Sequence, residues 1–444
     1  PEGPARARSR NPEDPRMTDA AEAPAPRPRL GDEKPTLGNP RDYGYSPFAP
    51  RLWHGMTTWA WFRMIGGHLA EISPRRYPLV LTVTLTSLIN SVTCILANLV
   101  YWRGLSRTKL EGSPVFIVGF QRSGTTWLNE LLATDPRFGY PSNLQCLQPE
   151  TYLINRFVMR PLMKRALPKK RPMDDVDLDP DSPQEDEIAL MLSGLPSPYT
   201  LMAFPRSVDR YRAALQQEHF DPRTRARWTL GWLRFLHEVQ FVNPGKRLLL
   251  KSPTHTVRVH RILDTFPDAK FIHITRDPYR IFNSNLKLGK ALTATQGLAP
   301  RAFSQADIIE ELLEGFANFH RAYFEIRKRI PEGSLVTVAY EELLQDPEAV
   351  MRRIYDELDL GDFGPVEGPL REYIAKRKDY KVNPYNLDPA IAEAIDERWS
   401  AYFEEFGYRK IHEQEADAAA AEAEAADTAE ETPAEAEKAG SAAR

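Results

Sequence analysis

The segment from Pro114 to Asp135, PVFIVGFQRSGTTWLNELLATD, constrains the fold more than any other part of this chain. An apolar run ends at Gly119, and an amphipathic pattern begins near Trp127, after a short loop that holds a second glycine, Gly124. This order predicts a buried strand, a glycine loop and a helix, the arrangement that turns backbone N–H groups toward a phosphate. It indicates an α/β protein.

The loop departs from the nucleotide P-loop in the position of its cation. A P-loop requires Lys after the second glycine, where this chain has Thr125. The cation here is Arg122, two residues before that glycine. Together with Arg122, the hydroxyls of Ser123, Thr125 and Thr126 can donate to an anion at the helix N-terminus. The alternative is a plain tight turn between a strand and a helix.

Composition limits the class of protein. The chain has 444 residues, of which 42% are apolar and 27% charged, as in ordinary globular proteins. A net charge of −3 gives no electrostatic basis for binding nucleic acid. The two cysteines, Cys94 and Cys146, are too few for a disulfide framework, so we expect a reducing, cytoplasmic setting.

The two ends of the chain have the composition of disordered tails. Residues 1–45 are rich in Pro, Arg, Ala and Glu, and residues 411–444 are almost all Ala, Glu, Asp and Thr. Between them we expect a helical appendage at 46–110 and one α/β domain at 111–410. Met17 is a candidate for the true start.

The appendage contains an unusual segment, because no charged residue occurs between Arg76 and Arg103. Leucines and other apolar residues recur at helical spacing, and polar residues such as Ser87 and Asn90 fall on the opposite face. Such a helix suits the protein core or a subunit interface, a membrane surface, or a membrane span. Contact of residues 78–102 with a membrane surface and a homodimer therefore both remain open.

Strands and helices alternate after Pro114. The stretch 247–275 reads as a strand, a helix and a strand, and another strand is expected at 334–339. This length fits a βαβ unit and hence a parallel sheet with right-handed crossovers. Residues 150–245 are expected to be mostly helical.

A second candidate anion site is the sequence RDPYRIFNS, from Arg276 to Ser284. It follows a strand directly, so Arg276 is expected at the carboxyl edge of the sheet, where ligands bind in open α/β folds. Arg276 and Ser284 could hold a second phosphate there. A capped surface helix is the alternative.

Two more groups could carry chemistry. In KSPTH, Lys251 ends a strand at the same sheet edge and could neutralise charge during group transfer, and His255 could be a general base. In PQEDE, Glu185 or Glu187 could be the base. The alternatives are a histidine held at a helix N-terminus, and acidic residues that complement a helix dipole.

Together these motifs resemble the sulfotransferase superfamily, which uses 3′-phosphoadenosine 5′-phosphosulfate (PAPS). The loop FQRSGTTW is similar to that family's phosphosulfate loop, which implies that Arg122, Ser123, Gly124, Thr125, Thr126 and Trp127 surround the 5′-phosphosulfate. RDPYRIFNS is similar to its 3′-phosphate motif, which implies Arg276 and Ser284 as ligands. The resemblance also implies Tyr340 near the adenine, Lys251 at the transferring group, and Lys381 in a loop that closes on the cofactor.

The sequences PQEDE and LLKSPTH, with a terminal Trp399, Phe403 and Gly407-Tyr408 element, are most similar to a broad bacterial branch that is akin to the tyrosylprotein sulfotransferases. The position of the base differs between branches. Glu185, Glu187 and His255 therefore all remain candidates.

The resemblance implies transfer of a sulfuryl group from PAPS to a hydroxyl or amine acceptor. No metal is expected, since protein cations can handle the charge. The acceptor is a small molecule, a lipid, a saccharide or a protein, and the sequence does not distinguish these. Two other functions remain: a P-loop-type nucleotide-dependent kinase, and a non-catalytic scaffold that retains the fold.

Overall fold

The structure is a computed structural model, and it describes residues 40–43, 45, 49–166, 179–207, 212, 214–218, 220–299, 305–376 and 387–413. The tails expected at 1–45 and 411–444 lie almost entirely outside these residues, so their disorder remains a prediction.

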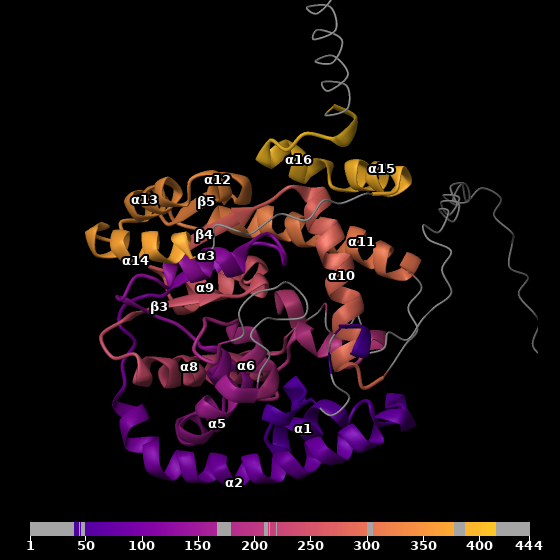
Figure 1. The fold of residues 1–444 in the computed structure, drawn as a ribbon, viewed down its shortest axis with the longest axis vertical. Coiled ribbons are helices and arrows are strands. Elements are labelled where there is room, and N and C mark those ends of the chain that lie inside the picture. Colours follow the sequence, from indigo (N-terminus) through magenta and orange to yellow (C-terminus); the bar gives the residue numbers. More distant parts are fainter. Residues whose placement is uncertain are drawn as a thin grey trace, which may run out of the picture.

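Five parallel strands form the central sheet, in the order β2-β3-β1-β4-β5 (Figure 1). In chain order these strands are β1 Val115–Val118, β2 Phe138–Gly139, β3 Arg247–Lys251, β4 Lys270–Thr275 and β5 Leu335–Ala339. Four of them coincide with the strands expected from apolar runs. The two-residue β2 has no such run.

The central strand β1 positions the site. Its four residues are all buried, and it pairs with β3 through Ile117 and Lys251 and with β4 through Val118 and His273. The expected βαβ unit at 247–275 is present, but β1 lies between its two strands. The strands that follow β1 in the chain lie on both sides of it, β2 and β3 on one side and β4 and β5 on the other. The carboxyl end of β1 is therefore a topological switch point, where ligands bind in open α/β sheets.

Helices cover both faces of the sheet. The helices that share a core with one face are α3 Thr125–Leu132, α12 Tyr340–Gln345, α13 Pro347–Leu358 and α14 Gly364–Ala375. Those on the other face are α6 Asp186–Leu192, α8 Pro222–Val242 and α9 Val259–Thr265. A third core joins α10 Pro278–Gln296, α11 Gln305–Ile326, α15 Pro389–Arg398 and α16 Ser400–Phe406.

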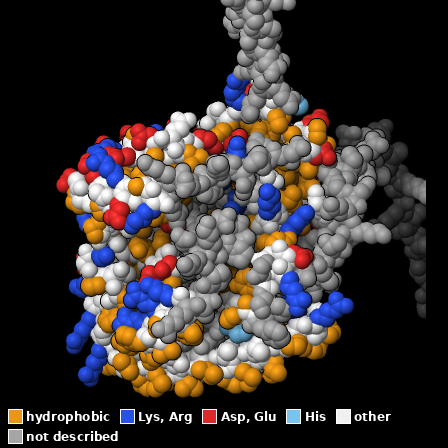
Figure 2. All heavy atoms as spheres, viewed as in Figure 1, with side chains coloured by type: hydrophobic (Ala, Val, Ile, Leu, Met, Phe, Trp, Pro, Cys, Tyr) orange, Lys and Arg blue, Asp and Glu red, His pale blue; other side chains and the backbone are white. Residues whose placement is uncertain are grey.

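The N-terminal part forms its own layer. The first part of the expected helical appendage is divided into a 3-10 turn at Leu52–Gly55, α1 Thr58–Ile65 and a further turn at Leu69–Glu71. The long helix α2 Tyr77–Arg107 follows and runs along one side of the molecule, next to α1 and α5 Tyr152–Ala166 (Figure 1). Figure 2 shows hydrophobic side chains gathered along this side. Between α3 and α5 lies the short α4 Asn143–Leu147. The division of the chain near residue 110 remains a prediction.

Candidate active site

The glycine loop joins β1 to α3 through three residues with positive φ. Gly119 has φ 150°, Arg122 φ 69° and Gly124 φ 104°. A Cβ on Gly124 would overlap the ring of Tyr340, and one on Gly119 would lie 2.7 Å from the carbonyl oxygen of Ile274. Both glycines are therefore required by close approach as well as by backbone conformation. The first N–H groups of α3 have no intrahelical acceptor, so they are available to a ligand at the helix N-terminus.

The loop and the RDPYRIFNS segment meet directly, although 154 to 162 residues separate them. The Arg122 side chain donates from Nε to the Ser284 hydroxyl at 2.8 Å, and Arg276 donates from Nη1 to the carbonyl of Arg122 at 2.9 Å. Asn285 Nδ2 donates to the carbonyl of Gln121 at 3.0 Å. The two segments predicted to bind anions therefore form one site.

Tyr340 closes this site from the end of β5. The Arg276 guanidinium lies 4.3 Å from the centre of the Tyr340 ring, and Trp127 meets the same ring edge to face at 5.9 Å. Aromatic rings stacked beside a cation offer a flat apolar surface next to charge. That is the kind of surface on which a purine base can rest.

The backbone at Arg276 is held by residues that the sequence did not single out for this purpose. The Tyr402 hydroxyl accepts from the Arg276 N–H at 3.1 Å and donates to its carbonyl at 3.0 Å. Glu341 accepts from the N–H of Asp277 at 3.0 Å and from the Tyr408 hydroxyl at 3.0 Å. The only sequence signal for this support was the terminal element containing Tyr408.

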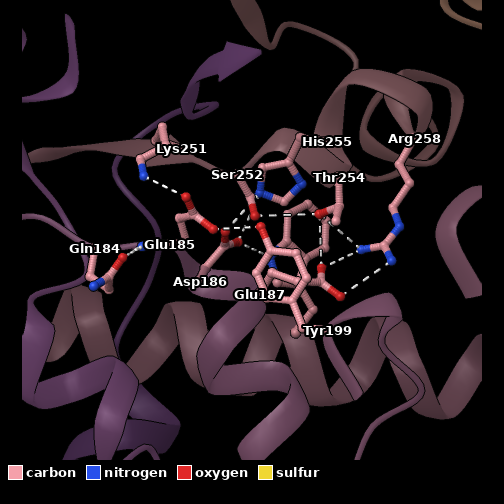
Figure 3. A network of polar contacts seen from close by, with 11 residues as sticks. Gln184, Glu185, Asp186, Glu187, Tyr199, Lys251, Ser252, Thr254, His255 and Arg258 are labelled. Atoms are coloured by element: carbon pink, nitrogen blue, oxygen red, sulfur yellow. Dashed lines mark hydrogen bonds and ion pairs between the residues drawn. The ribbon is translucent and has the colours of Figure 1, made fainter. Parts of the chain in front are cut away.

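On the other side of β1, a cation and a carboxylate are paired. Lys251 Nζ lies 2.8 Å from Glu185 Oε1 and 3.4 Å from the Thr126 hydroxyl of the glycine loop. The Lys251 side chain is only 2% exposed, and that of Glu185 is 19% exposed. Tyr199 donates its hydroxyl to Glu185 Oε2 at 2.5 Å (Figure 3). Burial, followed by the Glu185 charge, raises the pKa of Tyr199 well above its usual value, so this hydroxyl stays protonated as a donor.

The other two candidate bases are embedded in separate buried pairs (Figure 3). His255 Nε2 lies 2.9 Å from Asp186 Oδ1, and Trp232 donates to the same carboxylate at 2.9 Å. Burial raises the pKa of Asp186, but the His255 charge and hydrogen bonds outweigh it, so that this pKa lies below its usual value. Glu187 accepts hydrogen bonds from Arg258 and Thr254.

A cavity of about 1810 Å³ connects the glycine loop, the Arg276 site and Glu185. Residues 122 and 124–127 of the loop, together with Arg276, Tyr340 and Glu185, line it. Its remaining wall is largely apolar, with Leu147, Met159, Met163, Leu201, Met202, Leu288, Leu292, Leu312 and Phe319. Glu185 therefore lies between the anion-binding loop and an apolar chamber.

Nearly all the site residues named from the sequence lie at this edge of the sheet. Those that surround the cavity mouth or its loop are Arg122, Ser123 to Trp127, Glu185, Lys251, Arg276, Ser284 and Tyr340. His255 and Glu187 lie behind the cavity and are fully buried. Lys381 falls outside the described residues. Tyr199 was missed because an isolated tyrosine after a glycine-proline stretch carries no signal.

These features define a class of protein. A parallel sheet whose central strand leads into an arginine-bearing glycine loop, beside a second arginine-serine site, is built to hold a donor with two anionic groups. The chain belongs to the sulfotransferase family, whose profile (Sulfotransferase family) matches residues 114–363. Sulfuryl transfer from PAPS is accordingly its activity, as expected, and neither a kinase nor a scaffold is favoured.

Sulfotransferases are also found among the relatives of this chain. The chain is 35% identical over 361 residues to the omega-hydroxy-beta-dihydromenaquinone-9 sulfotransferase Stf3 of Mycobacterium bovis, an alignment covering 81% of this chain and 92% of that protein. The protein of the same name from Mycobacterium tuberculosis matches equally well.

Solved structures show the same fold. Sulfotransferase STF9 of Mycobacterium avium superimposes with a TM-score of 0.59 at 19% identity, covering 82% of this chain and 93% of that one. For STF1 of Mycobacterium tuberculosis the TM-score is 0.55 at 16% identity, covering 81% and 96%. Among the described residues, no group of three or more His, Cys, Asp or Glu could hold a metal ion.

Proposed function

We propose that this sulfotransferase sulfates the hydroxyl group of a long, largely apolar alcohol. One observation carries this proposal: the cavity that holds the glycine loop and Glu185 continues into an apolar chamber. The total cavity of about 1810 Å³ exceeds the usual range for a small-ligand pocket, roughly 300–1,000 Å³. A donor and an elongated acceptor therefore have room to meet end to end.

The donor's two anionic groups would lie on either side of Arg122. The α3 N–H groups and the hydroxyls of Thr125 and Thr126 would hold the 5′-phosphosulfate, with Arg122 adding charge. The Ser123 hydroxyl donates to the carbonyl of Phe120 at 2.7 Å and so supports the loop itself. Arg276 and Ser284 would hold the 3′-phosphate. The rings of Tyr340 and Trp127 would lie beside the adenine. Lys381 has a role in the donor site through family resemblance alone.

Chemistry would occur beside the Lys251–Glu185 pair. The acceptor oxygen forms a bond to sulfur while the bond from sulfur to the bridging phosphate oxygen breaks, releasing adenosine 3′,5′-bisphosphate. Lys251 stabilises the charge that develops on the bridging oxygen, and Glu185 takes the acceptor proton. Glu185 is supported over Glu187 and His255 because it alone of the three lines the cavity.

The acceptor class draws on two independent supports. The relative at 35% identity is named for an omega-hydroxylated menaquinone, a lipid alcohol. The leucine and methionine side chains in the cavity wall suit the same chemistry. A cytoplasmic setting, contact of residues 78–102 with a membrane surface, and a homodimer also remain part of the proposal.

A matched pair of acceptors tests the proposal. The enzyme is given labelled PAPS and either a long isoprenoid alcohol with a terminal hydroxyl or a sugar alcohol that presents the same primary hydroxyl. We expect label in the isoprenoid product only. Transfer to the sugar alcohol with none to the isoprenoid would contradict the proposal.

A further inference from the structure

The helix α2 differs from a surface helix of an ordinary globular protein in the face that it exposes to solvent. Several of its polar residues face the protein: Ser87 is 0% and Asn90 7% exposed. The Asn90 amide donates to the carbonyls of His54 at 2.7 Å and Met56 at 2.9 Å, and the Ser91 hydroxyl accepts from the N–H of Thr58 at 2.9 Å. These hydrogen bonds, together with the apolar contacts of Val83, Leu79 and Val80, fix this helix to the body.

The opposite face of α2 is apolar and exposed. Its side chains include Leu85, Leu88, Ile89, Val92, Leu96 and Leu99, each between 48% and 66% exposed. The helices that contact α2 also expose large apolar side chains, with Phe62 of α1 and Phe157 of α5 half exposed or more. This forms the band of hydrophobic side chains along α2 in Figure 2. A contiguous apolar surface of this length marks an interaction site.

The two ends of α2 carry charge of one sign. No Asp or Glu occurs from residue 72 to residue 110, whereas Arg75 and Arg76 precede α2, and Arg103, Arg107 and Lys109 lie at its far end. Arg75, Arg103, Arg107 and Lys109 are exposed. Basic residues at both ends of an apolar helix face complement an anionic lipid surface.

We propose that the exposed face of α2 docks on the surface of a membrane that contains anionic lipids. The helix lies in the plane of the interface. It is long and apolar enough to cross a bilayer, but its polar face is bonded to α1 and the turn at Leu52–Gly55. If α2 spanned the bilayer, these hydrogen bonds would break and their polar groups would lie unpaired in hydrocarbon.

A second copy of this chain fits the band less well than lipid does. In an antiparallel pair of α2 helices, Arg75 and Arg76 of one copy would approach Arg103 and Arg107 of the other. In a parallel pair, identical basic ends would meet. Since residues 72–110 carry no acidic side chain, either arrangement sets like charges together, which opposes association. Lipid phosphates supply the missing opposite charge.

The docking face is continuous with the active-site cavity. Ile89 of α2 and Leu162 of α5 are 66% and 52% exposed, and both also line the cavity. A lipid alcohol could therefore pass from the bilayer between α2 and α5 and reach Glu185 without crossing water. This route rests on the acceptor class proposed above, whereas the docking itself does not.

Vesicle binding tests the docking without any substrate. The full chain is sedimented with unilamellar vesicles of phosphatidylcholine and phosphatidylglycerol in equal parts, and with phosphatidylcholine alone. We expect binding to the mixed vesicles that weakens as salt is raised. The double variant Val92→Glu/Leu99→Glu should lower the partition coefficient about ten-fold or more, because it places two charges in the hydrocarbon boundary.

The matched control is Ala349→Glu/Ala401→Glu, which adds the same two charges to exposed positions on α13 and α16, away from α2. It should bind vesicles as the wild type does. A second variant, Leu85→Gln/Leu96→Gln, repeats the test without charge, and thermal unfolding of each variant confirms that it is folded.

Wild-type protein that stays in the supernatant, or folded α2 variants that bind as tightly as the control, would overturn the docking. So would a wild-type dimer in light scattering that the α2 variants convert to monomer without any loss of vesicle binding. If vesicles bind but no isoprenoid alcohol is sulfated, the docking stands and the proposed acceptor fails.

Discussion

Lys251 Nζ lies 2.8 Å from Glu185 Oε1, and this pair joins the end of β3 to the start of α6 at the carboxyl edge of the sheet. The pair sits between the glycine loop, which Lys251 reaches through Thr126, and the apolar chamber, which Glu185 lines. A cation and a carboxylate in contact here can share the work of transfer. One stabilises the leaving oxygen, and the other accepts the proton of the attacking hydroxyl.

Lys251→Met should lower turnover by about 10²–10³-fold, because a fixed cation at the developing charge is lost. It also leaves Glu185 without its cation. We therefore expect the effects of Lys251→Met and Glu185→Gln to be non-additive in a double-mutant cycle of single-turnover rates. Strict additivity would mean that the two residues act independently.

Arg276→Ala should weaken binding of adenosine 3′,5′-bisphosphate by about 2 kcal/mol or more, because a charged partner of a covered phosphate is removed. Titration calorimetry measures this directly. Arg321→Ala serves as the control, since its side chain bonds Asn318 at the surface of α11. Unchanged affinity in Arg276→Ala would move the 3′-phosphate to another part of the cavity.

Gly124→Ala should impair donor binding and stability together. The substitution puts a Cβ into the Tyr340 ring and into a backbone with φ 104°. Gly245→Ala is a matched control: Gly245 also has positive φ, 71°, but a Cβ there meets nothing within 4 Å. Both variants carry a left-handed backbone cost of about 1–2 kcal/mol. The excess in Gly124→Ala, measured by urea unfolding, reports the contact with Tyr340.

Asp186→Asn tests whether His255 has a structural role. Removing one partner of a buried pair should cost about 3–5 kcal/mol of unfolding free energy. Because the folded-state pKa of Asp186 is depressed, its contribution is fully present above the unfolded value of about 3.9 and is lost as pH falls through the folded value.

The wild type should therefore lose stability more steeply than Asp186→Asn below about pH 4. Urea midpoints across this range give the difference. Parallel pH curves for the two proteins would show that the Asp186 carboxylate is not stabilised by His255.

The strands, the glycine loop and the Arg276–Ser284 segment were predictable because each consists of contiguous residues. Apolar runs located four of the five strands, and the stretch after β4 placed Arg276 at the sheet edge. The strand order was not predictable, because the insertion of β1 between β3 and β4 depends on packing between distant segments.

Other features depend on three-dimensional neighbours. Glu185, Asp186 and Glu187 are adjacent in sequence, yet only the fold aims them at three different partners: Lys251, His255 and Arg258. The sequence likewise located both faces of α2 but not their orientation. Its polar face turned inward because backbone carbonyls near His54 need donors.

The most direct test of the account is the rate at which Glu185→Gln transfers labelled sulfate from PAPS to a long isoprenoid alcohol. The same substitution at Glu187 and the change His255→Ala are its comparisons. We predict a loss of about 10²–10⁴-fold in Glu185→Gln with unchanged affinity for adenosine 3′,5′-bisphosphate. Wild-type turnover in that variant, with the loss falling instead on folded Glu187→Gln or His255→Ala protein, would contradict the account.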